Sequence, residues 1–305
     1  MAVARRHVVC HTAPSIMRRH RYARIAVLAV AVGVSASSTA AQDNPAPPSS
    51  IPPAPAQTDE AIVNLPTTLS LKTHGSYFRL THRFARDLRR GTFGDLAQDL
   101  FSLDNGAIIG LEYRFGLTPN AQVGIHRSTF DKAIVLFGRW DAWAQSEDRP
   151  IGVAVGVAFE GDNNLKLDHQ PSASFTISHT HGTRVAVYAT PTYVHHAHTD
   201  TLLALHEGHA VPGVPVDTRR DTFFLGLGGR LRVLQSAYLV AEASPRLAGY
   251  DPDRAAWNVG IEKTTHGHTF QLNFGNNFDT TPGQIARGGD PQSVFLGFNI
   301  SRKFY

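Results

Sequence analysis

Apolar residues alternate with small or polar residues along several stretches of the chain, and this two-residue period restricts those stretches to β-strands. In the clearest example, residues 151–159, Ile, Val and Phe occupy one face and Gly and Ala occupy the other. Three further stretches, 109–116, 223–233 and 257–262, confine Arg and Glu to one face. The chain is therefore predicted to be all-β, with each strand apolar on one side.

Strands of this kind have two interpretations, and the connections between them separate the two. In a soluble sandwich the apolar face forms the core, whereas in a membrane barrel it contacts lipid and the charged face lines the lumen. The predicted connections alternate between tight turns and longer loops, with one exception, a brief connection at 128–131 where a long loop is due. Barrels with short periplasmic turns and long outer loops have this order. We expect about twelve strands, an even number as in bacterial single-chain barrels, near residues 70–84, 107–116, 120–127, 132–144, 150–160, 170–180, 183–195, 221–235, 237–245, 255–265, 268–276 and 292–304.

The fold class predicted for residues 67–305 is thus an antiparallel up-and-down transmembrane β-barrel in contact with outer-membrane lipids. The segment from Val294 to the last residue is predicted to be a terminal strand with an aromatic end. It is similar to the signal read by the machinery that assembles the outer-membrane barrels of Gram-negative bacteria. We expect that machinery to be a partner, and the assembly signal to comprise Phe298, Ile300, Phe304 and Tyr305.

Residues 1–41 have the pattern of a cleaved secretory signal peptide. Basic residues from Arg18 to Arg24 precede an apolar run at 25–36 that is too short to span a bilayer, and small residues follow it up to Ala41. Cleavage is expected after Ala41. Met17 is an alternative start, because a signal needs nothing upstream of it. The mature protein is therefore expected in the outer membrane.

Removing this leader changes the charge of the chain. The leader contains six Arg and no Asp or Glu, so the formal net charge goes from +4 to −2 and no argument for binding nucleic acid remains. The only cysteine, Cys10, also lies in the leader, so the mature chain has no disulfide and no thiolate metal site. Residues 42–66 contain seven prolines and few apolar side chains, which predicts an extended periplasmic tether.

The strand sequences resemble the bacterial β-barrel family known as domain of unknown function 5777. The stretches that carry the resemblance are FRLTHRF (78–84), LEYRFGLT (111–118), VGIHRSTFDK (123–132), LGLGGR (225–230), GIEKTTHGHTFQL (260–272) and FNISR (298–302). They extend from the first strand to the last. The resemblance implies a membrane-bound barrel and supplies no substrate.

Charged residues on the polar strand faces are the candidate lumen-lining residues: Arg79, Arg83, Glu112, Arg114, Glu160, Arg230, Arg232 and Glu262. Inside a barrel, Arg and Glu side chains either hold one another in place or set the ion preference of a pore. The sequence therefore predicts a passive narrow pore for small polar solutes or a closed structural barrel, with no cofactor and no enzymatic activity.

Two alternatives remain open. The long loop after residue 195 is rich in histidine, a common metal ligand, and its weak candidates are His195, His196, His198, His206 and His209. The HExxH spacing of a zinc protease is absent, because His206 and His209 are only three positions apart. The second alternative is a lipid hydrolase embedded in the barrel, for which His82 on an outward strand face is the candidate, although no GxSxG motif occurs.

Overall fold

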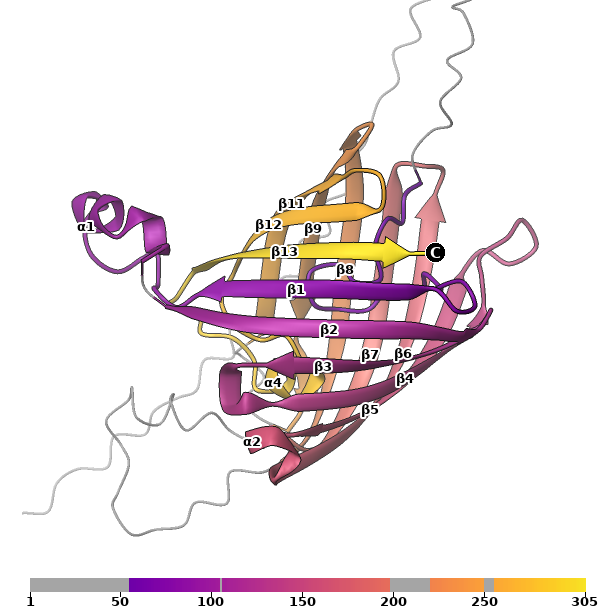
Figure 1. The fold of residues 1–305 in the computed structure, drawn as a ribbon, viewed down its shortest axis with the longest axis horizontal. Coiled ribbons are helices and arrows are strands. Elements are labelled where there is room, and N and C mark those ends of the chain that lie inside the picture. The colour runs from indigo at the N-terminus through magenta and orange to yellow at the C-terminus, as the bar shows by residue number, and fades with distance from the viewer. Residues whose placement is uncertain (1–54, 105, 198–219, 250–254) are drawn as a thin grey trace, which may run out of the picture. The chain divides into compact units, whose positions relative to one another are not determined.

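The structure, a computed structural model, describes residues 55–104, 106–197, 220–249 and 255–305 (Figure 1). The expected signal peptide and the first part of the expected tether lie outside these residues. Within them, no helix has the length and apolar character needed to cross a bilayer as a helix.

Twelve long strands form the wall of the described part of the chain, and they lie close to the predicted positions. They are β1 (Ser76–Phe84), β2 (Ala107–Thr118), β3 (Ala121–Ser128), β4 (Ile134–Trp143), β5 (Gly152–Gly161), β6 (Leu167–His181), β7 (Val185–Ala197), β8 (Arg220–Leu234), β9 (Ala237–Ser244), β11 (Ala256–Thr264), β12 (His268–Gly275) and β13 (Phe295–Phe304). The largest difference is at β1, which was predicted from residue 70 and begins at Ser76.

The sheet closes on itself. Each strand pairs antiparallel with its neighbour in sequence from β1 to β9, β11 pairs with β9 and β12, and β13 pairs with β12 and β1. The short β10 (Arg246–Ala248) pairs with β8 beyond the end of β9. Every long strand therefore has two neighbours, and the predicted antiparallel up-and-down barrel is confirmed.

The two ends of the barrel differ in their connections. We call the end with the brief turns after β2, β4, β6, β8 and β11 the short-turn end; β1 begins there and β13 finishes there. The opposite end, the long-loop end, carries α1 (Phe93–Gln98) after β1, α2 (Asp162–Leu165) after β5 and α4 (Pro282–Ala286) after β12. In Figure 1, α1 projects away from the barrel whereas α4 lies within its outline.

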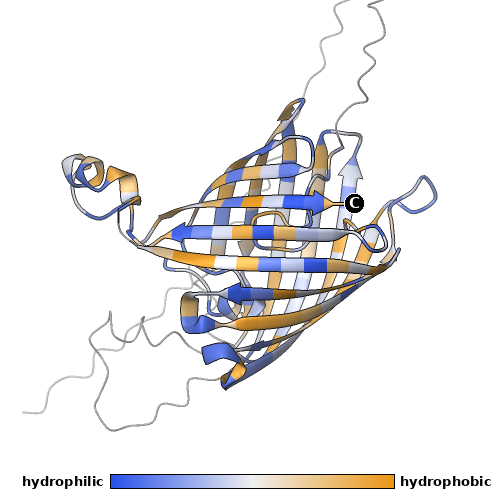
Figure 2. Ribbon diagram, viewed as in Figure 1, coloured by the Kyte–Doolittle hydropathy of each residue, from blue (hydrophilic) through white to orange (hydrophobic). Residues whose placement is uncertain are grey.

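The apolar strand faces point outward and the charged faces point inward. Val157 and Ile261 are 59% and 58% exposed, whereas the inward Arg230 and Glu262 are 1% and 0% exposed. Figure 2 shows the resulting alternation of hydrophobic and hydrophilic residues along the strands. This arrangement is the reverse of a soluble sandwich, whose apolar face forms the core, and it is the one a lipid-facing barrel needs.

The lumen contains an N-terminal segment, residues 55–71, which we call the lumen segment. It enters at the short-turn end, turns back between Ala61 and Pro66, which form a β-bridge, and returns to that end before β1. Ile62, Val63 and Leu65 are 0–2% exposed. In Figure 1 the indigo lumen segment is visible behind β1 and β13.

This position corrects the expectation that residues up to Pro66 form an extended tether. The expectation rested on the scarcity of apolar side chains, which usually leaves a segment unable to fold in water. Inside the barrel, however, Ile62, Val63 and Leu65 join a small apolar cluster with side chains of the wall, and hydrogen bonds and ion pairs bind the rest of the segment. Glu60, for example, is completely buried.

Candidate functional site

The tip of the lumen segment is held by one carboxylate of the wall. Glu242 on β9 accepts hydrogen bonds from the backbone nitrogens of Val63, Asn64 and Leu65, with Oε2 distances of 3.0, 2.9 and 3.0 Å. Asn258 on β11 donates to the other oxygen of the same carboxylate at 3.2 Å. The three successive N–H groups form an anion-binding turn, and the carboxylate of Glu242 is the anion that this turn binds. Charge-assisted hydrogen bonds of this kind are among the stronger ones.

Arginines on β1 bind the opposite side of the tip. Arg79 Nη2 donates to the carbonyl oxygen of Val63. Arg83 Nη2 donates to the Asn64 side-chain oxygen at 2.9 Å, and its Nη1 donates to Asn299 Oδ1 at 2.8 Å. The backbone nitrogens of the tip therefore face Glu242, whereas the carbonyl oxygen of Val63 accepts from Arg79 and that of Ile62 accepts from Gln271. These buried peptide groups are thus satisfied.

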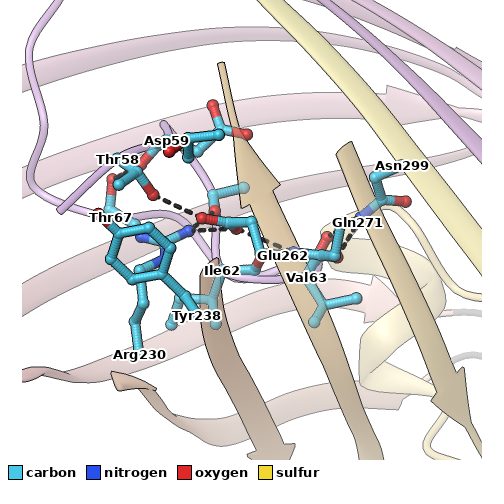
Figure 3. Close-up of polar contacts among 12 residues, drawn as sticks. Thr58, Asp59, Ile62, Val63, Thr67, Arg230, Tyr238, Glu262, Gln271 and Asn299 are labelled. Carbon is cyan, nitrogen blue, oxygen red and sulfur yellow. Dashed lines mark hydrogen bonds and ion pairs between the residues drawn. The ribbon is translucent and has the colours of Figure 1, made fainter. Parts of the chain in front are cut away.

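A fully buried ion pair lies beside the entering arm of the segment. Arg230 Nη2 on β8 and Glu262 Oε2 on β11 are 2.9 Å apart, and both side chains are 0% exposed. Glu262 also accepts hydrogen bonds from the Thr58 hydroxyl at 2.5 Å and from Gln271 Nε2 at 3.2 Å. Arg230 Nη2 donates in addition to the carbonyl oxygen of Ala61 at 3.0 Å. Figure 3 shows this network, which joins the wall strands to the lumen segment through shared acceptors.

Two inward-facing glycines of β8 provide the surface against which the tip packs. A Cβ atom added at Gly226 would lie 2.8 Å from Leu65 Cδ2, and one added at Gly228 would lie still closer to Ile62 Cδ1. Both distances are too short for carbon atoms, so a larger residue at either position would force Leu65 or Ile62 to shift. The outward-facing Gly229 is different, since its nearest contact would be the Ala186 oxygen at 3.7 Å.

Glu60 occupies a basic pocket in the wall. Its Oε2 lies 3.5 Å from Arg139 Nη1 and 3.7 Å from Arg114 Nη1, and its Oε1 lies 3.7 Å from Lys303 Nζ. Gln122 Nε2 donates to Oε2 at 3.2 Å. The pocket thus combines side chains from β2, β3, β4 and β13 around one carboxylate.

A cavity of ≈ 120 Å³ remains between the lumen segment and the long-loop end. Arg114, Arg139, Glu112 and His126 line one part of it, and small side chains of β5 and β6 line another, among them Ala154, Gly156, Ser172 and Ser174. The alternation in the β5 sequence therefore leaves open space inside the barrel at this level.

The loop between β12 and β13 fills the lumen from the long-loop end. Glu160 at the end of β5 accepts hydrogen bonds from Thr281 Oγ1 at 2.5 Å and from the Gly283 nitrogen at 2.8 Å, which anchors the start of α4. Arg287 after α4 contacts Asp131 at 2.5 Å and Asp162 at 3.5 Å. Burial raises the pKa of Asp162 to about 7 although the nearby Arg287 opposes the shift.

The candidate lumen-lining residues all project from the predicted inward faces, with different degrees of burial. Seven of them are 0–6% exposed: Arg79, Arg83, Glu112, Arg114, Glu160, Arg230 and Glu262. Arg232 is only partly buried and donates to Thr183 Oγ1 at 2.7 Å near the short-turn end. Opposite charges lie close together, as in the contact of 2.6 Å between Arg114 Nε and Glu112 Oε1.

Residues central to this arrangement were missing from the sequence prediction. Arg139 on β4 and Glu242 on β9 lie on inward strand faces, so the same alternation of residues would have found them. Glu60 had no such signal, because it lies in a proline-rich segment without periodicity.

The histidine-rich loop is only partly described, and His198, His206 and His209 lie outside the described residues. His195 and His196, at the end of β7, have stacked rings with centroids 3.7 Å apart. Asp221 on β8, which the sequence did not single out, lies 2.9 Å from His195 Nδ1. The three residues offer ligand atoms within 4.8 Å of one another and are largely exposed.

The remaining candidates lie on the outside of the barrel. The ring of His82 stacks on that of Phe298, with centroids 4.8 Å apart, and its centroid lies 4.4 Å from that of Phe84. His82 therefore packs against aromatic neighbours. Phe298 and Ile300 are half-buried on β13, and Phe304 and Tyr305 are 43% and 70% exposed. Lys72 Nζ lies 4.5 Å from the centre of the Tyr305 ring.

Comparison with known proteins places this architecture in context. No curated protein matches the chain. Among solved structures, the NanC porin has a TM-score of 0.46 at 7% identity and covers 75% of this chain and 99% of its own. The KdgM porin in complex with disordered oligogalacturonate has a TM-score of 0.47 at 7% identity, covering 76% and 99%.

The COG4313 outer-membrane channel of Pseudomonas putida F1 has a TM-score of 0.47 at 12% identity, covering 77% and 97%. These scores lie below 0.5, so the assignment of the fold rests on the strand pairing. A family model described as a membrane-bound β-barrel domain matches residues 58–304, which include most of the lumen segment. The chain therefore belongs to the membrane-bound β-barrel family DUF5777.

Proposed function

We propose that the protein is a passive outer-membrane pore for small polar solutes that its own lumen segment holds closed. The observation that supports this proposal is the way in which the wall binds the segment. Glu242 and Arg79 bind its backbone, and Gly226 and Gly228 give space to its side chains. Within the described residues, the segment continues into the wall only at β1, and its entering arm is held by noncovalent contacts such as that between Ser301 and Asp59. Departure of the arm at the short-turn end therefore breaks no covalent bond.

The orientation of the barrel in the membrane follows from the difference between its two ends. Barrels of the outer membrane have short periplasmic turns, which assigns the short-turn end and the lumen segment to the periplasm. The leader and the aromatic terminal strand support export to that membrane. The loop that carries α4 narrows the outer end. The cavity between the two obstructions, which Arg114 and Arg139 line together with apolar side chains, is the path we assign to solutes.

The test is planar-bilayer conductance of the mature chain and two matched variants. Gly228→Val places a side chain against Ile62 and is expected to expel the tip and raise the open probability. Gly229→Val adds the same side chain on the outward face and is expected to behave as the wild type does, with rare openings.

A reversible lock provides a second measurement. Ile62→Cys combined with Gly228→Cys places two thiols within reach of one another, and the only native cysteine, Cys10, lies in the leader. Oxidation of this pair by a mild thiol oxidant is expected to abolish the openings, and reduction is expected to restore them. If Gly228→Val is folded but silent, the barrel is a closed structural element, and a lipase assay of the same sample then tests the hydrolase alternative.

A second candidate function, binding of a divalent metal at the rim, has one observation in its favour. His195, His196 and Asp221 bring together imidazole and carboxylate ligands of the kind that Zn²⁺ prefers. Calorimetric titration with Zn²⁺ is expected to show binding that Asp221→Asn weakens, because the substitution replaces a charged carboxylate ligand with a neutral amide. Equal affinity in both proteins would assign any binding to other histidines.

A further inference from the structure

We infer that the basic pocket filled by Glu60 is an anion site of the open pore, and that Glu60 is a resident ligand which a small carboxylate solute replaces. This inference rests on the proposed function, because it requires the lumen segment to leave. The site consists of Arg114, Arg139, Gln122 and Lys303.

The charge of the wall is the first argument. Arg114 and Arg139 each have a carboxylate partner in the wall: Glu112 at 2.6 Å from Arg114 Nε and Asp141 at 2.8 Å from Arg139 Nε. Among the described side chains, no wall carboxylate is paired with Lys303. The group therefore carries one positive charge in excess, and Glu60 neutralises it when the lumen segment is in place.

The distances are the second argument. The contacts in the two pairs within the wall are 2.5–2.8 Å long, whereas the three cations lie 3.5–3.7 Å from Glu60. Glu60 Oε1 and Arg139 Nη1 make no hydrogen bond among the described residues. The wall is thus organised without Glu60, and Glu60 fits the pocket loosely. An exchangeable ligand has this character, whereas a structural ion pair such as Arg230–Glu262 is short and fully hydrogen-bonded at its acceptor.

The position of the pocket is the third argument. Arg114 and Arg139 also line the ≈ 120 Å³ cavity on the proposed solute path. A solute that entered from the cavity would meet the same two guanidinium groups that Glu60 faces. Planar guanidinium groups match carboxylate geometry well, which makes carboxylate anions the solute class that the site fits.

The first test is chemical rescue with acetate, and it needs no conductance. Glu60→Ala leaves a vacancy at the pocket, which is expected to lower the melting temperature in detergent. Acetate is expected to raise the melting temperature of Glu60→Ala by several degrees, since a ligand that binds only the folded state stabilises it. Acetamide and an equal concentration of chloride are expected to have no such effect.

The matched control is Asp59→Ala, because Asp59 is the neighbouring buried carboxylate and accepts a hydrogen bond from the Ser301 hydroxyl at 2.7 Å. Acetate is expected to leave this variant unchanged, and Arg139→Gln is expected to abolish the rescue in Glu60→Ala. Equal rescue of both alanine variants, or none in Glu60→Ala, overturns the inference.

The second test separates this inference from the proposed function. In Gly228→Val, the reversal potential across a KCl gradient is expected to indicate anion preference, and Lys303→Gln is expected to reduce it. Conduction without anion preference overturns the inference and leaves the pore intact. Absence of conduction overturns the pore, while the acetate rescue still decides whether the pocket binds carboxylates.

Discussion

The carboxylate of Glu242 lies 3.0 Å from the backbone nitrogen of Val63, so a side chain of the wall holds the main chain of the lumen segment. Because the contact is made to the backbone, it does not depend on the side chains at the tip. The anchoring carboxylate is therefore the residue whose loss should free the segment most directly.

Glu242→Gln is expected to destabilise the barrel by roughly 1–3 kcal/mol, because an amide supplies one acceptor oxygen in place of two and brings its own donors toward the N–H groups. The lumen segment should also become sensitive to protease. Urea unfolding in detergent and limited proteolysis measure the two effects. Glu147→Gln, in an exposed turn, is the matched control and is expected to change neither. Equal behaviour of the two variants would show that Glu242 does not anchor the tip.

The outward face of β5 gives a prediction about lipid contact. Val157, at mid-strand and 59% exposed, is expected to lose roughly 2–4 kcal/mol of stability in a bilayer when it is replaced by Arg, as charges at the midplane of barrel strands do. Val157→Leu should be neutral. A fluorophore on Val157→Cys should be quenched by lipid-phase quenchers. Quenching only by water-soluble reagents would contradict the outward assignment.

The ion pair between Arg230 and Glu262 predicts that the stability losses caused by replacing each residue are not additive. Arg230→Leu is expected to cost about 3–5 kcal/mol, because it leaves the fully buried Glu262 without its cation. Arg230→Leu combined with Glu262→Leu should recover much of that loss, since no buried charge then remains. Denaturant unfolding of the single and double variants measures the coupling. If the two single effects simply add, the pair is not the structural element described above.

Asp162 predicts a dependence of stability on pH. Its pKa is raised from 3.8 to about 7, so the folded protein holds a proton that the unfolded chain releases. Stability is therefore expected to fall, by an amount on the order of 1–3 kcal/mol, as the pH rises from 3.8 through about 7. Asp162→Asn should flatten this dependence. Thermal unfolding across this range compares the two proteins, and parallel curves would assign the effect to another group.

The strands were predictable because the lipid-facing and lumen-facing residues of a barrel wall differ in character and alternate along each strand. β5 was expected at 150–160 and spans 152–161, since lipid selects Val, Phe and Ile on one side and the lumen selects Gly and Ala on the other. The two-residue alternation along the strands does not show which segment fills the lumen. Glu60 and Asn64 are ordered by partners on the wall strands, such as Gln122 at a separation of 62 residues and Glu242 at one of 178. Nothing near Glu60 or Asn64 in the sequence indicates these contacts.

The contacts of the lumen segment also bear on the order of events during assembly. Asp59 meets Ser301 across a separation of 242 residues, and Thr58 meets Glu262 across 204. The lumen segment precedes the whole barrel in the sequence, so it finds these partners only after the last strands are in place. Contacts this distant in sequence slow folding, because a long chain must be closed before they form. We therefore expect wall closure and docking of the N-terminal arm to appear as separate kinetic phases during refolding, and removal of the arm to abolish only the later one.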